Sequence, residues 1–270
     1  MAGLFSIIAT PIGNLSDLSP RAGTALKNSA VIFAENTLHS RKLLAVIGVD
    51  LTKTKLVACP PAKEKDRIPA LLEMLAAGLD VSLISDAGAP AVSDPGGRLI
   101  QAVIGAGYKL EVIPGPSAVI AALMGAGLMT TRFAFLGFLP KKGRERVRLI
   151  KQSYQTGLAP VIFESPHRIT ETLHELYELL GPQPVVIARE LTKQFETFHR
   201  GILGSALTPP LVEKGEMVIV IEAPAEAGAP VAENAEPAAP AIGHKASAKK
   251  LAKDLGISVK DAYQKLINAK

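Results

Sequence analysis

The feature that most constrains the fold is an alternation of short apolar runs and longer helical patterns along residues 1–114. The expected strands are residues 4–10, 31–35, 55–59, 80–85 and 109–114, and the expected helices are residues 19–29, 37–48, 64–78 and 96–107. Strands linked by helices pair in parallel through right-handed crossovers. Residues 1–114 are therefore predicted to form an α/β domain with a mainly parallel sheet.

The same alternation continues over residues 115–222, which predict a second α/β domain. Its expected strands are residues 132–138, 159–165, 184–190 and 216–222, with helices around Val147 and over residues 169–180.

The last part of the chain has a different composition. Residues 223–243 are rich in Ala, Pro and Glu and hold little that can be buried, which is typical of a flexible linker. Residues 244–270 regain a helical period, and Ser247, Gly256 and Ser258 stand at cap positions. This spacing predicts a small helix–turn–helix-like tail. The formal net charge of the chain is +5, and lysines of this tail supply the whole excess, which favours a polyanionic partner.

Cysteine content and hydropathy exclude several classes of protein. Cys59 is the single cysteine, so neither an internal disulfide nor a cysteine zinc cluster is possible, and a small buried side chain is the expected role. No apolar run approaches the roughly 18–20 residues that span a bilayer, and the start lacks the basic region of a signal peptide. A soluble cytoplasmic protein without a membrane partner is expected.

Three loops of small residues follow the first, fourth and fifth expected strands. They read TPIGNLSD from Thr10, SDAGAPAVSDPG from Ser85 and PGPSA from Pro114. Parallel α/β sheets bind ligands beyond the carboxyl ends of their strands. Glycine lets a ligand approach bare backbone, and N–H groups at the start of the following helix can meet an anion. The three loops therefore predict a ligand site.

Two common nucleotide-binding motifs are absent from the sequence. Neither G-x-G-x-x-G nor G-x-x-x-x-G-K-[ST] occurs, so a dinucleotide site and a P-loop are both disfavoured. The sequence also offers no metal-ligand cluster, and no metal site is expected.

Several longer motifs resemble one protein family. They are ATPIGNLSDLSPRA, AENTLHSRKLL, SLISDAGAPAVSDPG, VIPGPSA, GFLP, FESPHRI and ARELTKQFETFHRG, in this order over about residues 4–222. The chain is thus similar to the ribosomal RNA small subunit methyltransferase I family, the ribose 2′-O-methylating branch of the tetrapyrrole methylases. Ala89 and Ala91 depart slightly from the usual residues of the second loop.

The resemblance implies a fold, a cofactor and a substrate. The expected fold is two α/β domains with a cofactor cleft between them, plus the small helical tail. The implied methyl donor is S-adenosylmethionine, and the implied target is a cytidine in the decoding region of 16S ribosomal RNA within the 30S subunit. A homodimer is also implied.

Cofactor-binding residues are expected in the three loops and in the second domain. Pro11, Ile12 and Gly13 would form one wall, with a tight strand-to-helix turn as the less favoured alternative. Asp86 would accept hydrogen bonds from the cofactor, beside the bare backbone of Ala87 and Gly88. Ser117 and Ala118 open a helix that can meet a carboxylate, although Ser117 also suits a plain helix cap. From the family pattern, Thr130, Thr131 and Phe163 would line the second wall, with a core position as the alternative for Phe163.

The attacking ribose hydroxyl is a poor nucleophile, so a proton acceptor is sought. Glu164 and His167 are the catalytic candidates. Glu35 and Glu190 are further candidates, with salt bridges to Arg41 and Arg189 as the structural alternative.

Basic residues gather in two places that are predicted to bind RNA. Residues 132–151 hold seven Lys and Arg against one Glu, although a solvated helix face would look the same. The predicted RNA-binding residues are Lys141, Lys142, Arg144 and Arg146 of this segment, Arg168 and Arg189 nearby, and Lys249, Lys250 and Lys253 of the tail.

Two other functions remain open from the sequence. A sister enzyme that methylates a carbon of a tetrapyrrole would share the cofactor loops but would not need the basic segments. A nucleic-acid-binding regulator would use the tail but would leave the three loops unexplained.

Overall fold

The computed structural model describes residues 2–224. The first sheet contains β1 (Phe5–Ile8), β2 (Val31–Ala34), β3 (Lys55–Ala58), β4 (Val81–Ile84) and β5 (Leu110–Ile113). Their order is β3-β2-β4-β1-β5, and every pairing is parallel, as the sequence predicts. β4 lies at the centre beside β1 and β2, and all three strands are buried, which explains why they are mainly apolar.

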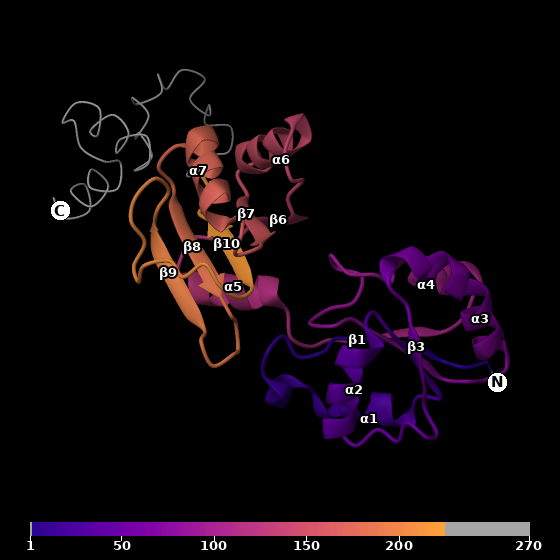
Figure 1. Cartoon of the computed structure of the whole chain (residues 1–270). Coiled ribbons are helices and arrows are strands. Elements are labelled where there is room, and N and C mark those ends of the chain that lie inside the picture. Colours follow the sequence, from indigo (N-terminus) through magenta and orange to yellow (C-terminus); the bar gives the residue numbers. More distant parts are fainter. Residues whose placement is uncertain (1, 225–270) are drawn as a thin grey trace, which may run out of the picture. The chain divides into compact units, whose positions relative to one another are not determined.

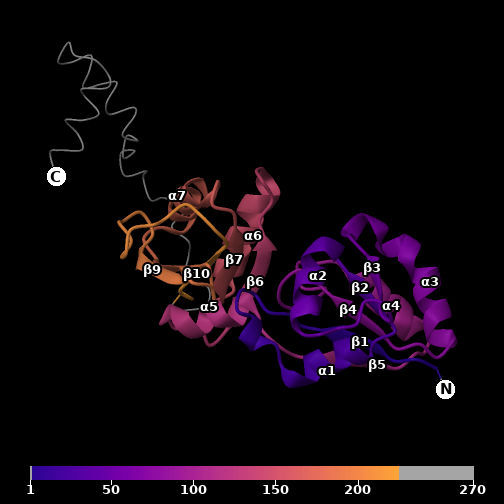
Figure 2. The same cartoon turned by 60° about the horizontal axis from the view of Figure 1, so that its bottom comes forward.

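Helices cover both faces of this sheet (Figures 1 and 2). They are α1 (Pro20–Asn28), α2 (Thr37–Val46), α3 (Glu64–Ala76) and α4 (Gly97–Gly105), with short 3-10 turns at Leu15–Asp17 and Pro61–Lys63. α1 begins as predicted, because the Ser19 hydroxyl accepts a hydrogen bond from Ala22 N at 3.1 Å and Pro20 occupies the first helical position.

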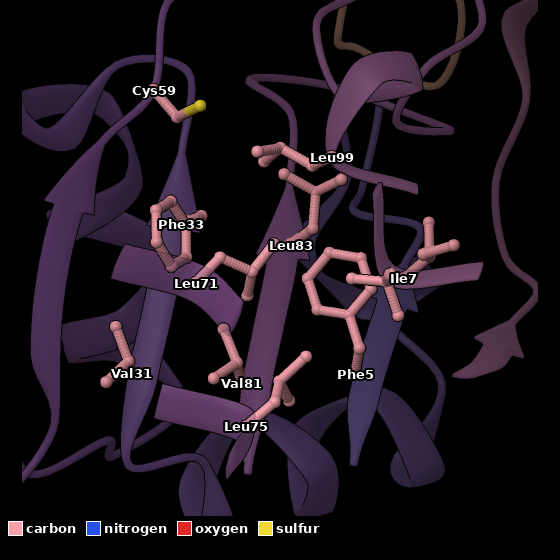
Figure 3. Packing of buried hydrophobic residues seen from close by; sticks show 11 residues of the cluster. Phe5, Ile7, Val31, Phe33, Cys59, Leu71, Leu75, Val81, Leu83 and Leu99 are labelled. Carbon is pink, nitrogen blue, oxygen red and sulfur yellow. The ribbon is translucent and has the colours of Figure 1, made fainter. Parts of the chain in front are cut away.

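Alternate side chains along the strands point to opposite faces of the sheet, and each face has its own hydrophobic core. Phe5, Phe33 and Leu83 pack against Leu71 of α3 and Leu99 of α4, as Figure 3 shows. Their neighbours in the strands face α1 and α2 on the other side of the sheet. The two helix layers are therefore set by the period-two pattern of the strands.

Cys59 lies in the first of these cores and is 1% exposed. Burial raises the pKa of its thiol to about 11. The prediction of a small buried side chain is confirmed.

The second sheet is formed by the second half of the chain. Its elements are α5 (Ala118–Ala126), β6 (Phe133–Phe138), α6 (Arg144–Gln155), β7 (Ala159–Glu164), α7 (Ile169–Leu180), β8 (Pro184–Arg189), β9 (Thr197–Ile202) and β10 (Met217–Ile221). The strand order is β6-β7-β10-β8-β9. α5 packs on one face through Val119 and Ala122, against Val161, Val186 and Val220, while α6 and α7 pair on the other (Figure 1).

The pairing in this sheet is mixed, unlike that of the first sheet. Only β6 and β7 are parallel, whereas β10 runs antiparallel to β7 and β8, and β8 runs antiparallel to β9. β8 and β9 are joined by a short loop without a helix, which forces the chain to turn back.

The sequence analysis also missed β9. This strand, TFHRGI, lies at the edge of the sheet and pairs only with β8 among the strands. Its sequence has no continuous apolar run: Arg200 is exposed, and the buried His199 forms a 2.9 Å hydrogen bond between its Nδ1 and Pro209 O. The apolar pattern that reveals a buried strand is therefore missing.

The predicted linker and basic tail lie almost entirely outside the described residues. Within the described part of the chain, no helix is long and apolar enough to cross a membrane.

Candidate functional site

The three small-residue loops come together at one edge of the first sheet. They follow β1, β4 and β5, which are immediate neighbours in the order β4-β1-β5. The first two loops are tied by a pair of backbone hydrogen bonds, from Thr10 N to Gly88 O at 2.9 Å and from Gly88 N to Thr10 O at 3.1 Å. Gly88 has φ +76°, and a Cβ there would stand 3.3 Å from Ile12. Glycine is therefore needed both for the backbone conformation and for the close packing of the loops.

A cavity of about 350 Å³ opens at this edge. Its first wall comes from the three loops, and its second wall comes from the ends of β6, β7 and β8 and from the start of β10. The lining residues are Ile12, Ala87, Gly88, Ala89, Val92, Ser93, Asp94, Ser117, Ala118, Val119, Phe138, Phe163, Glu164, Ser165, Pro166, Ala188, Leu191, Gly215, Glu216, Met217 and Val218. Its volume lies in the range of small-molecule pockets, roughly 300–1,000 Å³.

Asp86 stands at the end of β4 beside this cavity. Its Oδ1 atom is buried and has no hydrogen-bond partner in the described part of the chain. A buried carboxylate oxygen without a partner costs free energy, so its retention points to a ligand that supplies a donor.

Two further carboxyl groups lie close to Asp86. The pKa of Asp94 is raised, mainly by burial and also by the charge of Asp86. The pKa of Glu35 is raised by burial and by the charges of Asp94 and Asp86. The end of β4 is therefore the acidic side of the site. Among the described residues, no group of three or more His, Cys, Asp or Glu side chains could hold a metal ion.

Ser117 is both a lining residue and a helix cap. Its hydroxyl accepts a hydrogen bond from Ile120 N at 3.5 Å at the start of α5. The cap alternative is thus realised, while Ser117 and Ala118 also border the cavity, where the positive end of the helix dipole faces the pocket mouth.

Phe163 and Phe138 form the aromatic part of the second wall. The ring centroids of Phe163 and Phe135 are 4.9 Å apart, and those of Phe163 and Phe138 are 5.5 Å apart, both in edge-on arrangements. Phe163 also packs against the core of the second sheet, so it has both of its expected roles.

Glu164 lines the cavity but is occupied by an internal network. It is 2% exposed, and its carboxylate accepts hydrogen bonds from Ser165 N at 2.8 Å, Thr172 Oγ1 at 2.6 Å and Arg168 Nη2 at 3.0 Å. Three of its roughly four lone-pair sites are used. This geometry favours a positioning role over proton transfer. His167 is exposed two residues after Ser165 and is outside the cavity lining.

Other predicted cofactor residues lie around the cavity rather than in it. Pro11, Gly13, Asp86, Thr130 and Thr131 are not among the lining residues. Gly13 instead packs against the loop after β8, where a Cβ would stand 2.8 Å from the backbone oxygen of Leu191. Next to it, Asn14 N donates to Thr192 Oγ1 at 3.1 Å.

The predicted RNA-binding residues separate into two groups. Lys141, Lys142 and Arg144 are exposed, and their positions leave them free to contact phosphate. Arg146 is 3% exposed and pairs with Glu175, Thr172 Oγ1 and the Pro140 carbonyl, so its position contradicts a role in RNA binding.

Arg168 and Arg189 are also committed to internal contacts. Arg168 pairs with Glu164 and donates to Leu139 O at 3.2 Å. Arg189 donates to the carbonyls of Lys214 and Phe195. These contacts favour structural roles for both side chains. Lys249, Lys250 and Lys253 lie outside the described residues.

Glu190 also has a structural partner. It pairs with Lys193 Nζ at 2.9 Å, and that lysine, rather than Arg189, is its ion-pair partner.

Sequence reasoning missed several lining residues. Val92 and Ser93 lie inside the second loop, whereas Leu191 and residues 215–218 come from segments with no ligand-loop composition. Residues 215–218 reach the cavity because β10 lies between β7 and β8 in the sheet. No local sequence pattern predicts that position.

Comparison with known proteins identifies the family. The family model of the tetrapyrrole (corrin/porphyrin) methylases matches residues 5–207. Proteins named ribosomal RNA small subunit methyltransferase I are similar over most of the chain. The protein from Xylella fastidiosa is 40% identical over 229 residues, with 83% of each chain covered. The one from Halalkalibacterium halodurans is 36% identical over 273 residues and covers 97% of this chain and 93% of its own length.

Solved structures share the fold at lower identity. The methyltransferase CobJ superposes with a TM-score of 0.63 at 19% identity, covering 82% of this chain and 95% of its own. A conserved hypothetical protein from Aeropyrum pernix K1 gives 0.64 at 20% identity, covering 83% and 85%. The chain therefore belongs to the tetrapyrrole methylase family and, within it, to the ribosomal RNA small subunit methyltransferase I group.

Proposed function

We propose that this chain transfers a methyl group from S-adenosylmethionine to the ribose 2′-hydroxyl of a cytidine in the decoding region of 16S ribosomal RNA. The relatives' printed names support a small-subunit ribosomal RNA substrate. The observation that carries the proposal is one cavity with two unlike sides. Ala87, Gly88 and Ala89 line one side, next to Asp86 in the chain, and the other side leads from Phe138 along the chain to the exposed Lys141, Lys142 and Arg144.

The residues of the cavity fit S-adenosylmethionine. Beside the cavity, Asp86 Oδ1 has no hydrogen-bond donor among residues 2–224, and the hydroxyl or amino groups of a nucleoside would supply one. The amino-terminal end of α5, at Ser117 and Ala118, suits the carboxylate of the methionine part. Small side chains at Ala87, Gly88 and Ala89 leave room for a flat ring against the backbone.

The chain's own contribution to the reaction is mainly positioning. The bound cofactor supplies an electrophilic sulfonium methyl group. The two walls would hold the ribose oxygen close to that methyl group, and this positioning lowers the barrier to transfer. Glu164 acts by fixing Ser165 and Arg168 at the second wall. His167, exposed next to the lining residue Pro166 but itself outside the lining, is one candidate to accept the hydroxyl proton.

The proposal also includes a homodimer in the cytoplasm acting on the 30S subunit. α5 and the turn after it expose Ile120, Met124 and Met129 to 47%, 83% and 75%, and such an apolar surface suits a subunit interface. Light scattering on the purified chain would measure the oligomeric state, and a monomer at micromolar concentration would contradict the dimer.

The decisive experiment combines binding and product mapping. The purified chain is titrated with S-adenosylhomocysteine in a calorimeter and then incubated with methyl-labelled S-adenosylmethionine and 30S subunits from a strain lacking the enzyme. We expect binding heat and one new ribose methylation at a cytidine of 16S ribosomal RNA, located by mass spectrometry. Methylation of precorrin-type substrates but not of RNA would identify a tetrapyrrole enzyme instead. Nucleic-acid binding without any cofactor binding would favour the regulator.

A further inference from the structure

Phe138 is an exposed aromatic residue at the mouth of the cavity. It ends β6, is 61% exposed and lines the cavity. The chain has only eight phenylalanines and no tryptophan. An aromatic ring left in water beside a ligand site loses the free energy that burial would provide, so its position calls for a partner that covers it.

The ring is held by its neighbours on one side. Phe163 contacts Phe138 edge-on at 5.5 Å and itself rests on Phe135 at 4.9 Å. Phe163 is anchored in the core of the second sheet. One side of the Phe138 ring therefore packs against Phe163, while most of the residue stays exposed.

The backbone after Phe138 is fixed by two arginines. Arg168 Nη2 donates to Leu139 O at 3.2 Å, and Arg146 Nη1 donates to Pro140 O at 3.0 Å. Both guanidinium groups are tied to Thr172 or Glu164 within the buried network. Leu139 is 2% exposed and anchors the segment further. The ring therefore projects from a preorganised support, which reduces the entropy lost on binding.

Positive charge follows immediately along the chain. Lys141, Lys142 and Arg144 are all exposed, and Glu145 is the single acidic residue of this segment. An aromatic ring beside exposed cations is the usual arrangement for single-stranded nucleic acid, in which a base stacks on the ring and phosphates meet the cations. A ribose hydroxyl of paired RNA would be hard to bring into a cavity unless its nucleotide left the stack.

We propose that Phe138 is the stacking platform for the unstacked target nucleotide, with Lys141 and Lys142 contacting the phosphates that flank it. The proposal rests on the RNA methylation proposed above and assigns the base-recognition surface of that site. The ligand class is a single-stranded pyrimidine nucleotide of RNA. Arg146 and Arg168 are positioning residues, because they hold the segment that presents the ring.

The test compares Phe138→Leu, Phe138→Trp and a matched control, Phe195→Leu. Leucine keeps an apolar side chain but cannot stack, whereas tryptophan restores a flat ring. Phe195 is 64% exposed and lies outside the cavity lining. Steady-state methylation of 30S subunits gives kcat/KM, and calorimetry gives the affinity for S-adenosylhomocysteine. In addition, a ribosomal RNA fragment carrying pyrrolocytidine at the target position reports stacking through quenched fluorescence.

We expect Phe138→Leu to lower kcat/KM by about 10- to 100-fold, the range of one lost base–aromatic stack. Its affinity for S-adenosylhomocysteine and its melting temperature should match those of the wild type. Phe138→Trp should stay within about threefold of wild type, and Phe195→Leu should be unchanged. Quenching of pyrrolocytidine should be lost in the leucine variant and kept in the tryptophan variant.

Several results would overturn the assignment. Normal kcat/KM and quenching in Phe138→Leu would show that the ring does not stack a base. An equal loss of S-adenosylhomocysteine affinity would assign Phe138 to the cofactor, and a change of oligomeric state would assign it to a subunit interface. A wild-type chain that binds S-adenosylhomocysteine but methylates no ribosomal RNA would instead refute the proposed function, and this inference with it.

Discussion

The Oδ1 atom of Asp86, which has no hydrogen-bond partner within the described residues, is the most specific sign of a ligand next to the first wall. Asp86→Asn removes the charge while it keeps the shape of the side chain. Because a hydrogen bond to a charged acceptor is worth about 1 kcal/mol more than one to a neutral acceptor, we expect S-adenosylhomocysteine to bind roughly 5-fold more weakly. Calorimetry provides the measurement. Asp66→Asn, on the exposed first turn of α3, is the control, and equal affinities for the two variants would exclude Asp86 from the site.

Glu35 makes the stability of the protein depend on pH. Its pKa lies above the ordinary value of 4.5 because of burial and because of the nearby Asp94 and Asp86. The folded state therefore holds the proton more tightly than the unfolded state, so stability falls as the pH rises from that value through the raised pKa. Glu35→Gln removes this loss, and we expect its melting temperature at pH 7 to rise by about 1–2 °C. The gain should disappear below about pH 4. Thermal unfolding between pH 4 and 8 measures both effects, and a gain that is independent of pH would refute the assignment.

Arginines of α6 look alike in sequence but differ in environment. Arg146 is buried between α6 and α7, whereas Arg148 on the same helix is exposed. Arg146→Ala leaves the Thr172 hydroxyl, the Glu175 carboxylate and a carbonyl without their donor. We expect a loss of about 2–3 kcal/mol in the free energy of unfolding, or roughly 5–10 °C in melting temperature.

The matched control for this change is Arg148→Ala, which should alter the melting temperature by less than about 1–2 °C. Equal effects of the two substitutions would contradict the buried network that joins α6 and α7.

The segment between β6 and α6 is expected to carry charge contacts to RNA. Lys141→Ala combined with Lys142→Ala removes two exposed cations near Phe138. A plot of log affinity against log salt concentration has a negative slope, and each lost phosphate contact makes it shallower by about 0.7–0.9. The double substitution should therefore reduce the magnitude of the slope by roughly 1.5. Filter binding of a 16S ribosomal RNA fragment at several salt concentrations gives the slope. Lys27→Ala with Lys42→Ala, on α1 and α2, is the control, and an equal change there would mean that the contacts are not local.

The contact between the loop after β1 and the loop after β8 joins the two sheets around the cavity. A Cβ at Gly13 would stand 2.6 Å from Thr192 Oγ1 and 2.8 Å from Leu191 O. Gly13→Ala therefore forces these loops apart. We expect about 1–3 kcal/mol of destabilisation and a weaker affinity for S-adenosylhomocysteine.

Gly105→Ala is the control for this substitution. Gly105 ends α4 and has open space around the position of a Cβ, so its melting temperature should stay level or rise slightly. An unchanged Gly13→Ala variant would show that the two loops adjust to the added methyl group without loss.

Local patterns in the sequence were sufficient for the first sheet and for the loops beside it. Each helix lies between two parallel strands there, so the apolar period, the cap at Ser19 and the glycines of the β4 loop carry the information within a few residues. Local patterns also marked Asp86 and Ser117, because small residues and turn formers gather at strand ends.

Long-range packing settled the rest. The antiparallel insertion of β10, the edge strand β9 and the burial of Arg146 all depend on contacts between distant segments. The sequence lists Arg146 among seven similar cations, and only its distance to Glu175 and Thr172 separates it from them. The spacing of apolar residues and the choice of turn residues involve neighbouring positions, so both can be recognised in the sequence. Strand order in a mixed sheet and the partner of a buried charge depend instead on the free energy of the whole fold.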